Sequence, residues 1–168
     1  MVLNHLALVE LEWWLESLDM RQEKPIKILS TDLMMSSDAA KGKYGGWGAH
    51  CGEVSTGGPW DQEERKEHIN ILELKAAFLG IQTFLKDSSP ESIHLQIDNT
   101  TALAHLVKMG RPTVVKLIAL TKKIYNYLLP RGITLTAEYI PSKLNVISDF
   151  QSRNTHESSQ WIWRSQFS

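Results

Sequence analysis

The order of extended and helical patterns most constrains how this chain can fold. Residues 27–60 contain extended segments separated by glycine-rich turns at residues 42–46 and 57–59, a pattern that predicts hairpins. Helices and strands then alternate: a helix over residues 70–86, a strand over 93–97, a helix over 113–129, a strand over 133–139 and a helix over 142–153. This succession predicts an α/β fold in which helices cover a mixed sheet.

The length suits one domain with flanking segments. The chain has 168 residues, 42% of them hydrophobic, which suffices for a single core. An amphipathic pattern over residues 5–20, closed by Pro25, predicts a helix before the domain. We therefore expect a connecting helical segment at residues 1–25, the domain at 26–155 and an irregular tail at 156–168. The tail's aromatic residues, Trp161, Trp163 and Phe167, are expected to pack on the domain rather than bind a ligand.

Several classes of protein are disfavoured by composition. Cys51 is the single cysteine, which excludes an internal disulfide and a cysteine-rich zinc site. No basic leader precedes the first apolar stretch, and no apolar run reaches the roughly 20 residues that span a bilayer. We expect an intracellular protein, cytoplasmic or nuclear, that is neither secreted nor bound to a membrane.

Four acidic residues are candidates for a metal centre: Asp38, Glu73, Asp98 and Asp149. Each lies at the end of an extended segment or within a predicted helix. Carboxylates that converge repel one another unless a cation compensates them. Ligand sets made only of oxygen favour Mg²⁺ or Mn²⁺, and two such ions about 4 Å apart suit phosphodiester hydrolysis. The four residues therefore indicate a nuclease if the fold brings them together.

Each acid also has a structural explanation. Asp38 fits a turn, Glu73 fits a capping box that begins at Asn70, Asp98 fits a helix cap and Asp149 fits an exposed helix position. Taken singly, each of these explanations is favoured. The order of the elements that carry the four residues favours convergence.

Basic residues are concentrated in the second half of the chain. The formal net charge is −1, yet no Asp or Glu occurs between Asn99 and Ala137. This stretch predicts either a surface that follows a phosphate backbone or an ordinary solvated helix face. The basic patch defined here consists of Lys108, Arg111, Lys116, Lys122 and Lys123.

The motifs that carry these residues resemble a known family. The chain contains, in order, SSDAAKGKYGGWGAH, HINILELKAAF, HLQIDNTTALAHL and IPSKLNVISDFQSR. They resemble the ribonuclease H domain of reverse-transcribing retroelements, most closely that of DIRS-like (tyrosine-recombinase) retrotransposons. Five blocks match in order, at residues 45–49, 57–60, 68–73, 98–102 and 145–153, and the likeness spans about residues 26–165.

The resemblance implies a fold and an activity. The fold would be ribonuclease H-like, a mixed five-stranded sheet with three antiparallel strands followed by two parallel ones and helices on both faces. Asp38, Glu73, Asp98 and Asp149 would be the catalytic residues that hold two Mg²⁺ ions, for which Mn²⁺ substitutes, with no small-molecule cofactor. The substrate would be the RNA strand of an RNA–DNA hybrid, cut to 5′-phosphate and 3′-hydroxyl ends. Substrate contacts are carried over to Ala39, Asn70, Thr100 and Asn145, and a reverse transcriptase polymerase domain is a candidate partner.

Three features depart from the family pattern. Related enzymes often carry a histidine ten residues before the last aspartate, where this chain has Tyr139, and a tyrosine with a pKa of ~10 is a poor proton shuttle at neutral pH. Thr31-Asp32 also resembles the start of the first block, although the hairpin that follows Asp38 favours the later aspartate. Residues 41–44 lengthen the turn after Asp38.

Two functions from different classes therefore remain open. The first is an active metal-dependent ribonuclease H. The second is a catalytically impaired or repurposed module that binds hybrid or structured nucleic acid, an alternative that Tyr139 keeps open. Four retained acids favour the enzyme, because a protein that only binds phosphate gains nothing from an uncompensated acidic cluster. A third and weaker interpretation is a resolvase or integrase-like nuclease, against which the hairpin blocks argue.

Overall fold

The computed structural model describes residues 11–13, 15, 33–108 and 114–155. Residues 11–13 and 15 are helical and fall within the helix predicted over 5–20. The rest of that helix, Pro25, the Thr31-Asp32 alternative, Arg111 and the aromatic tail at 156–168 lie outside the described residues.

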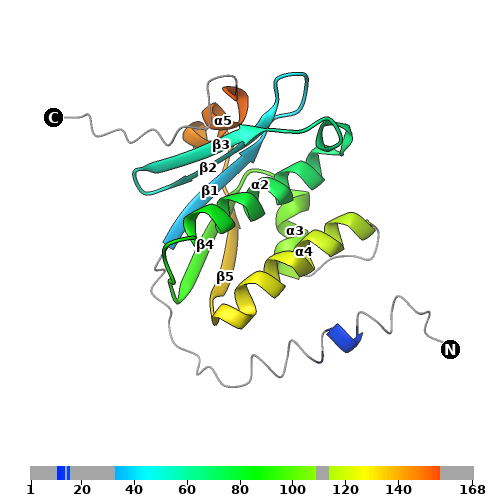
Figure 1. The fold of residues 1–168 in the computed structure, drawn as a ribbon, viewed down its shortest axis with the longest axis vertical. Coiled ribbons are helices and arrows are strands. Elements are labelled where there is room, and N and C mark those ends of the chain that lie inside the picture. The colour runs from blue at the N-terminus through cyan, green and yellow to red at the C-terminus, as the bar shows by residue number, and fades with distance from the viewer. Residues whose placement is uncertain (1–10, 14, 16–32, 109–113, 156–168) are drawn as a thin grey trace.

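The centre of the molecule is one five-stranded mixed sheet (Figure 1). Its order is β3-β2-β1-β4-β5, in which β1 to β3 pair antiparallel and β4 and β5 continue the sheet in parallel from β1. This arrangement confirms the predicted fold class. The strands are β1 (Leu33–Ala39), β2 (Gly46–Cys51), β3 (Val54–Pro59), β4 (Ser92–Ile97) and β5 (Thr134–Tyr139).

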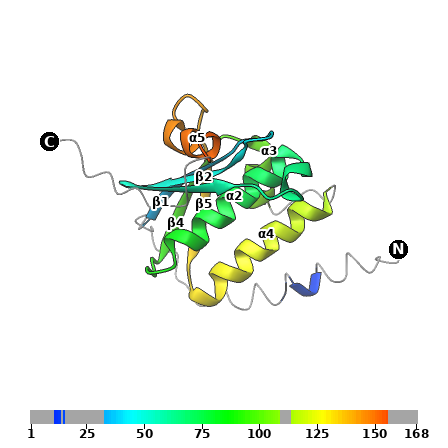
Figure 2. The same cartoon turned by 45° about the horizontal axis from the view of Figure 1, so that its top comes forward.

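Helices cover both faces of the sheet (Figure 2). On one face α2 (Ile69–Phe84) crosses the strands, with α3 (Thr100–Lys108) and α4 (Val115–Leu128) beside it. On the other face α5 (Val146–Arg153) lies over β1, β2 and β3. Short 3-10 helices, Glu64–Lys66 and Leu129–Arg131, precede α2 and follow α4. Among the described helices, none has the length and apolar character needed to cross a bilayer.

The main core lies between the sheet and the α2 side. Alternate residues of β4, Ile93, Leu95 and Ile97, point into it and are fully buried, as the period of two in the sequence predicts. They meet Leu74 and Ile81 of α2. A smaller cluster around Trp60 packs with Ala39, Leu72 and Ala76, and the Trp60 indole donates to the Ala40 carbonyl at 3.1 Å. This bond fixes the backbone just after Asp38.

The glycines at residues 57 and 58 do not form the predicted turn. They lie within β3, and the β2–β3 turn is at Gly52 and Glu53, where Gly52 has a φ of 60°. Gly57 pairs with Gly48 of β2. A Cβ on Gly48 would lie 2.2 Å from the carbonyl oxygen of Ser148 in α5. The prediction was wrong because these glycines allow a helix to approach the strands closely, a role that the sequence pattern does not distinguish from a turn.

The last predicted helix is shorter than expected. It was predicted over residues 142–153, but residues 142–144 form a turn and α5 begins at Val146. The Leu144 amide closes this turn on the Pro141 carbonyl at 2.8 Å. The turn sets where Asp149 lies along the sheet.

Candidate metal centre

Two of the four predicted acids meet at one end of neighbouring parallel strands. Asp38 is the second-last residue of β1, and Asp98 directly follows β4. In the parallel pairing of these strands Ser37 lies opposite Ile97. Asp38 follows Ser37 and Asp98 follows Ile97, so the two aspartates come next at the same end of the two strands. The carboxyl ends of strands in α/β sheets are where ligands usually bind.

Glu73 reaches the same place from α2. One carboxylate oxygen from each of Asp38, Glu73 and Asp98 lies within 4.8 Å of the others. Asp38 and Glu73 are each only 4% exposed. Three elements that are distant in the sequence thus place three carboxylates within the span of one or two cations.

The alternative explanations for Glu73 and Asp98 are wrong. The N-cap of α2 is His68, whose Nδ1 accepts from the Asn70 amide at 3.2 Å, so Glu73 lies beyond the capping position. The cap of α3 is Asn99, whose side-chain oxygen accepts from the Ala102 amide at 2.9 Å. Neither carboxylate therefore caps the N-terminus of a helix.

Burial and mutual repulsion disfavour the ionised forms of two carboxyl groups in this cluster. Burial, followed by the charges of Asp38 and Asp98, raises the pKa of Glu73 to about 9, against a partial opposing effect of a hydrogen bond from the Ala39 backbone. Burial also raises the pKa of Asp38 to about 6, with Asp98 and Asp149 adding to the rise. Among the described residues, Glu73 Oε2 is buried and has no hydrogen-bond partner. A donor set of buried carboxylates with one oxygen unpaired fits a hard divalent cation.

Asp149 is near this cluster but is turned to another partner. Its Oδ1 accepts a hydrogen bond from Arg153 Nε, one turn later in α5, at 2.7 Å, and its side chain is 39% exposed. It does not belong to the three-residue group, although its charge contributes to the raised pKa of both Asp38 and Glu73. The structure therefore brings three of the predicted acids together and places the fourth beside them in an ion pair.

Helix α5 is attached to β1 by two serines that the sequence analysis did not select. Ser152 Oγ donates a hydrogen bond to Asp38 Oδ2. Ser148 Oγ is 2.7 Å from Ser36 Oγ. Both α5 serines are fully buried, and they lie four residues apart in the sequence, so they share one side of the helix.

The predicted substrate residues differ in accessibility. Asn70 Oδ1 accepts from Asn99 Nδ2 at 3.0 Å, which links the start of α2 to the turn after β4, and Thr100 is exposed at the start of α3. Asn145 is only 2% exposed and donates to the Ser37 carbonyl at 2.9 Å. The side chain of Asn145 therefore fixes the loop before α5 to β1 and is not accessible to a substrate. Ala39 is also buried, and its backbone meets Glu73.

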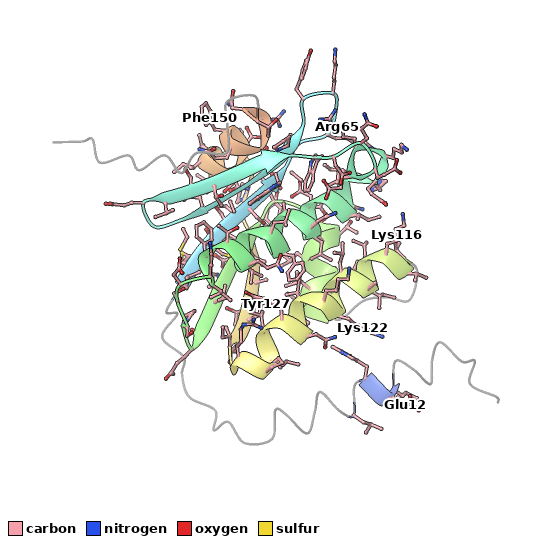
Figure 3. The ribbon with its side chains drawn as sticks, viewed as in Figure 1. Glu12, Arg65, Lys116, Lys122, Tyr127 and Phe150 are labelled. Atoms are coloured by element: carbon pink, nitrogen blue, oxygen red, sulfur yellow. The ribbon has the colours of Figure 1, made fainter. Side chains whose placement is uncertain are left out.

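Lys116 and Lys122 of the basic patch lie on α4 (Figure 3). Lys116 pairs with Glu67 at 2.6 Å, and Lys122 lies over the ring of Trp13 at 5.5 Å from its centroid. Lys108 ends α3, Lys123 lies in α4, and Arg111 is outside the described residues. Tyr139, the residue noted above as a departure from the motif pattern, ends β5 and is 48% exposed.

Comparison with solved structures identifies the fold. Ribonuclease H1 from the halophilic archaeon Halobacterium salinarum NRC-1 superposes with a TM-score of 0.59 at 14% identity, over 73% of this chain and 96% of that one. LC11-RNase H1, solved in complex with an RNA/DNA hybrid, gives 0.54 at 15% identity, over 71% and 93%. The foamy viral protease-reverse transcriptase, also with an RNA/DNA hybrid, gives 0.50 at 11% identity, over 80% of this chain and 21% of that one.

Sequence comparison alone does not lead to these proteins: no family model and no curated protein matches the chain. The superpositions cover nearly the whole of the two ribonuclease H1 chains and about three quarters of this one. The chain therefore has the ribonuclease H-like fold.

Proposed function

We propose that this protein is a metal-dependent endonuclease that hydrolyses the RNA strand of RNA–DNA hybrids. The observation that supports this activity best is the convergence of Asp38, Glu73 and Asp98 within 4.8 Å at the carboxyl ends of β1 and β4. The similar solved structures include two proteins described in complex with RNA/DNA hybrids. The fold and the acidic cluster both support hydrolysis of the RNA strand.

The carboxylates would hold two Mg²⁺ ions, for which Mn²⁺ would substitute. Bound divalent cations would activate a water molecule and neutralise negative charge on the phosphodiester. The products would carry 5′-phosphate and 3′-hydroxyl ends. Asp38 and Asp98 are fixed by the strands, and Glu73 is fixed by α2 from the opposite face. Asp149 completes the set when its carboxylate leaves the pair with Arg153.

Recognition of the hybrid would rest on shape and backbone contacts. Asn70 and Thr100 border the acidic cluster, because Asn70 is bonded to Asn99, the neighbour of Asp98. Such side chains suit contacts to sugar and phosphate, and selection of RNA depends on its 2′-hydroxyl groups. Lys108 and Lys123 of the basic patch would add attraction for the phosphate backbone, with weak sequence preference.

The biological setting that fits this activity is reverse transcription by a retroelement. The motif blocks resemble the ribonuclease H domain of DIRS-like retrotransposons, and one similar solved structure is a viral protease-reverse transcriptase. A polymerase domain is therefore the proposed protein partner, and the cytoplasm or nucleus is the proposed location.

Cleavage of labelled substrates tests the proposal. RNA–DNA hybrid, double-stranded RNA and double-stranded DNA are incubated with the full chain in Mg²⁺, Mn²⁺ or EDTA. We expect only the RNA of the hybrid to be cut, and only with metal. Asp98→Asn should abolish cleavage while it retains hybrid binding, whereas Asp87→Asn, at an exposed position after α2, should leave the rate unchanged. Equal activity in the two variants would contradict the assignment of the site.

The second candidate is a module that binds hybrid without cutting it. The pairing of Asp149 with Arg153 and the presence of Tyr139 favour this alternative, because both depart from a fully formed catalytic centre. In that case the wild-type chain would bind the hybrid in the same assay and release no product with either metal.

A further inference from the structure

Ser152 links helix α5 to Asp38, one of the proposed metal ligands. Its hydroxyl donates to Asp38 Oδ2, and the same Oγ lies 2.9 Å from the backbone carbonyl oxygen of Asp149. The serine therefore joins a strand near the start of the described domain to the helix at its end. Its side chain is fully buried, so water does not compete for the hydroxyl.

The surroundings of Ser152 leave its hydroxyl little freedom. A Cβ on Gly48 would lie 2.7 Å from the backbone nitrogen of Ser152, so α5 is seated directly on β2 at this point. The hydrogen bond to Asp38 fixes the rotation of that carboxylate, and it leaves Oδ1 as the oxygen without this bond. A carboxylate with one oxygen held in this way offers a cation a ligand that needs no reorientation.

We propose that Ser152 is a positioning residue that orients Asp38 for binding the divalent cation. This inference rests on the proposed function and adds a residue to its site. Ser152 does not touch the cation or the substrate in this role, and it acts only through Asp38. Loss of its hydroxyl should therefore weaken cation binding more than it weakens the fold.

Ser148 provides a matched control in the same helix. It is also fully buried, it lies one turn earlier on the same side of α5, and its hydroxyl is bonded to Ser36, which carries no charge. Ser148→Ala removes the same atom and the same kind of helix-to-strand contact as Ser152→Ala. The two variants differ in whether the lost bond reaches a carboxylate of the acidic cluster.

Binding of Mn²⁺, followed by electron paramagnetic resonance of the free ion without nucleic acid, tests the proposal. We expect Ser152→Ala to lower the affinity by about 10- to 100-fold, the usual effect of removing a hydrogen bond that orients a metal ligand. Ser148→Ala should leave the affinity unchanged. Ser152→Cys, which replaces the hydroxyl with a somewhat larger group that donates more weakly, should fall between wild type and Ser152→Ala. Urea unfolding with EDTA reports the loss of stability in each variant.

The outcomes separate this inference from the proposed function. Equal Mn²⁺ affinities for the two alanine variants would overturn the role of Ser152 even if the wild type binds metal and cuts hybrid. Absence of Mn²⁺ binding by the folded wild type would instead contradict the proposed function. If Ser152→Ala does not fold, an affinity of Ser152→Cys equal to that of wild type would also overturn the inference.

Discussion

The properties of the acidic cluster depend on single side chains, some of which the sequence predicts and some of which it does not. Asp38, Glu73 and Asp98 were predicted because each lies at the end of an extended segment or within a predicted helix, in an order that matches the motif blocks. Ser152 was not predicted, because a serine beside an aspartate in a helix carries no periodic signal. Its partner Asp38 is distant in sequence, and only the register of α5 on β1 brings them together.

Tyr139 is a residue at which the proposed enzyme differs from the family that its motifs resemble. It ends β5 and is half exposed, so a side chain at this position can reach solvent and a bound substrate. We expect Tyr139→His to raise the turnover rate on RNA–DNA hybrid, by as much as about 100-fold if proton transfer limits the wild type. The measurement is multiple-turnover cleavage between pH 6 and pH 8.

Tyr139→Phe is the control for this substitution. It removes only the phenolic hydroxyl, so its rate should equal that of the wild type. A histidine variant no faster than the phenylalanine variant would show that this position does not limit turnover.

Among the helices and strands, α5 is the one whose orientation the sequence pattern predicts least well. Its buried positions are Ser148 and Ser152, while Val146, Ile147 and Phe150 are exposed, so the usual pattern of apolar residues inside is reversed. Periodicity therefore orients this helix incorrectly. The feature that orients it is the pair Gly48 and Gly57, whose missing side chains leave room for the helix backbone. Strands β1, β2, β4 and β5 and the long helix α2, in contrast, follow their sequence patterns closely.

The seating of α5 on β2 can be tested with Gly48→Ala. The added Cβ would lie 2.2 Å from the Ser148 carbonyl oxygen, so the helix must move away from the strand. We expect a loss of about 1–3 kcal/mol in the free energy of unfolding, as for other overpacked interiors. Mn²⁺ affinity should fall as well, because Ser152 moves with the helix. Urea denaturation and metal titration measure the two effects.

Gly52→Ala is the matched control. A Cβ there meets nothing within 4 Å, but the φ of 60° is unfavourable for alanine. This variant should lose stability without any change in Mn²⁺ affinity. A Gly48→Ala variant that also keeps its affinity would contradict the link between α5 and the acidic cluster.

At the scale of the whole molecule, the acidic cluster makes stability depend on pH. The pKa of Glu73 is about 9 in the folded state against an ordinary value of 4.5, and that of Asp38 is about 6 against 3.8. Between the ordinary pKa and the folded-state pKa of each group, the folded protein binds more protons than the unfolded chain. The free energy of unfolding of the metal-free protein should therefore fall as pH rises from about 4.5 to about 9.

Glu73→Gln tests this dependence. We expect the variant to lose much of the pH slope and to be more stable than the wild type at pH 8 in EDTA, because the amide never ionises. Urea denaturation from pH 5 to pH 9 measures the slope, with Asp87→Asn as a control that should retain it. An unchanged slope in Glu73→Gln would mean that the buried carboxylate is not the source of the pH dependence.

The position of α5 at the end of the described chain also has a consequence for biosynthesis. Domains generally fold as units while the N-terminal part emerges from the ribosome first. Asp38, Glu73 and Asp98 are all translated before the residues of α5, yet Ser152 and Asp149 come only from that helix. A nascent chain therefore cannot bring the four acids and Ser152 together until almost the whole domain has been synthesised.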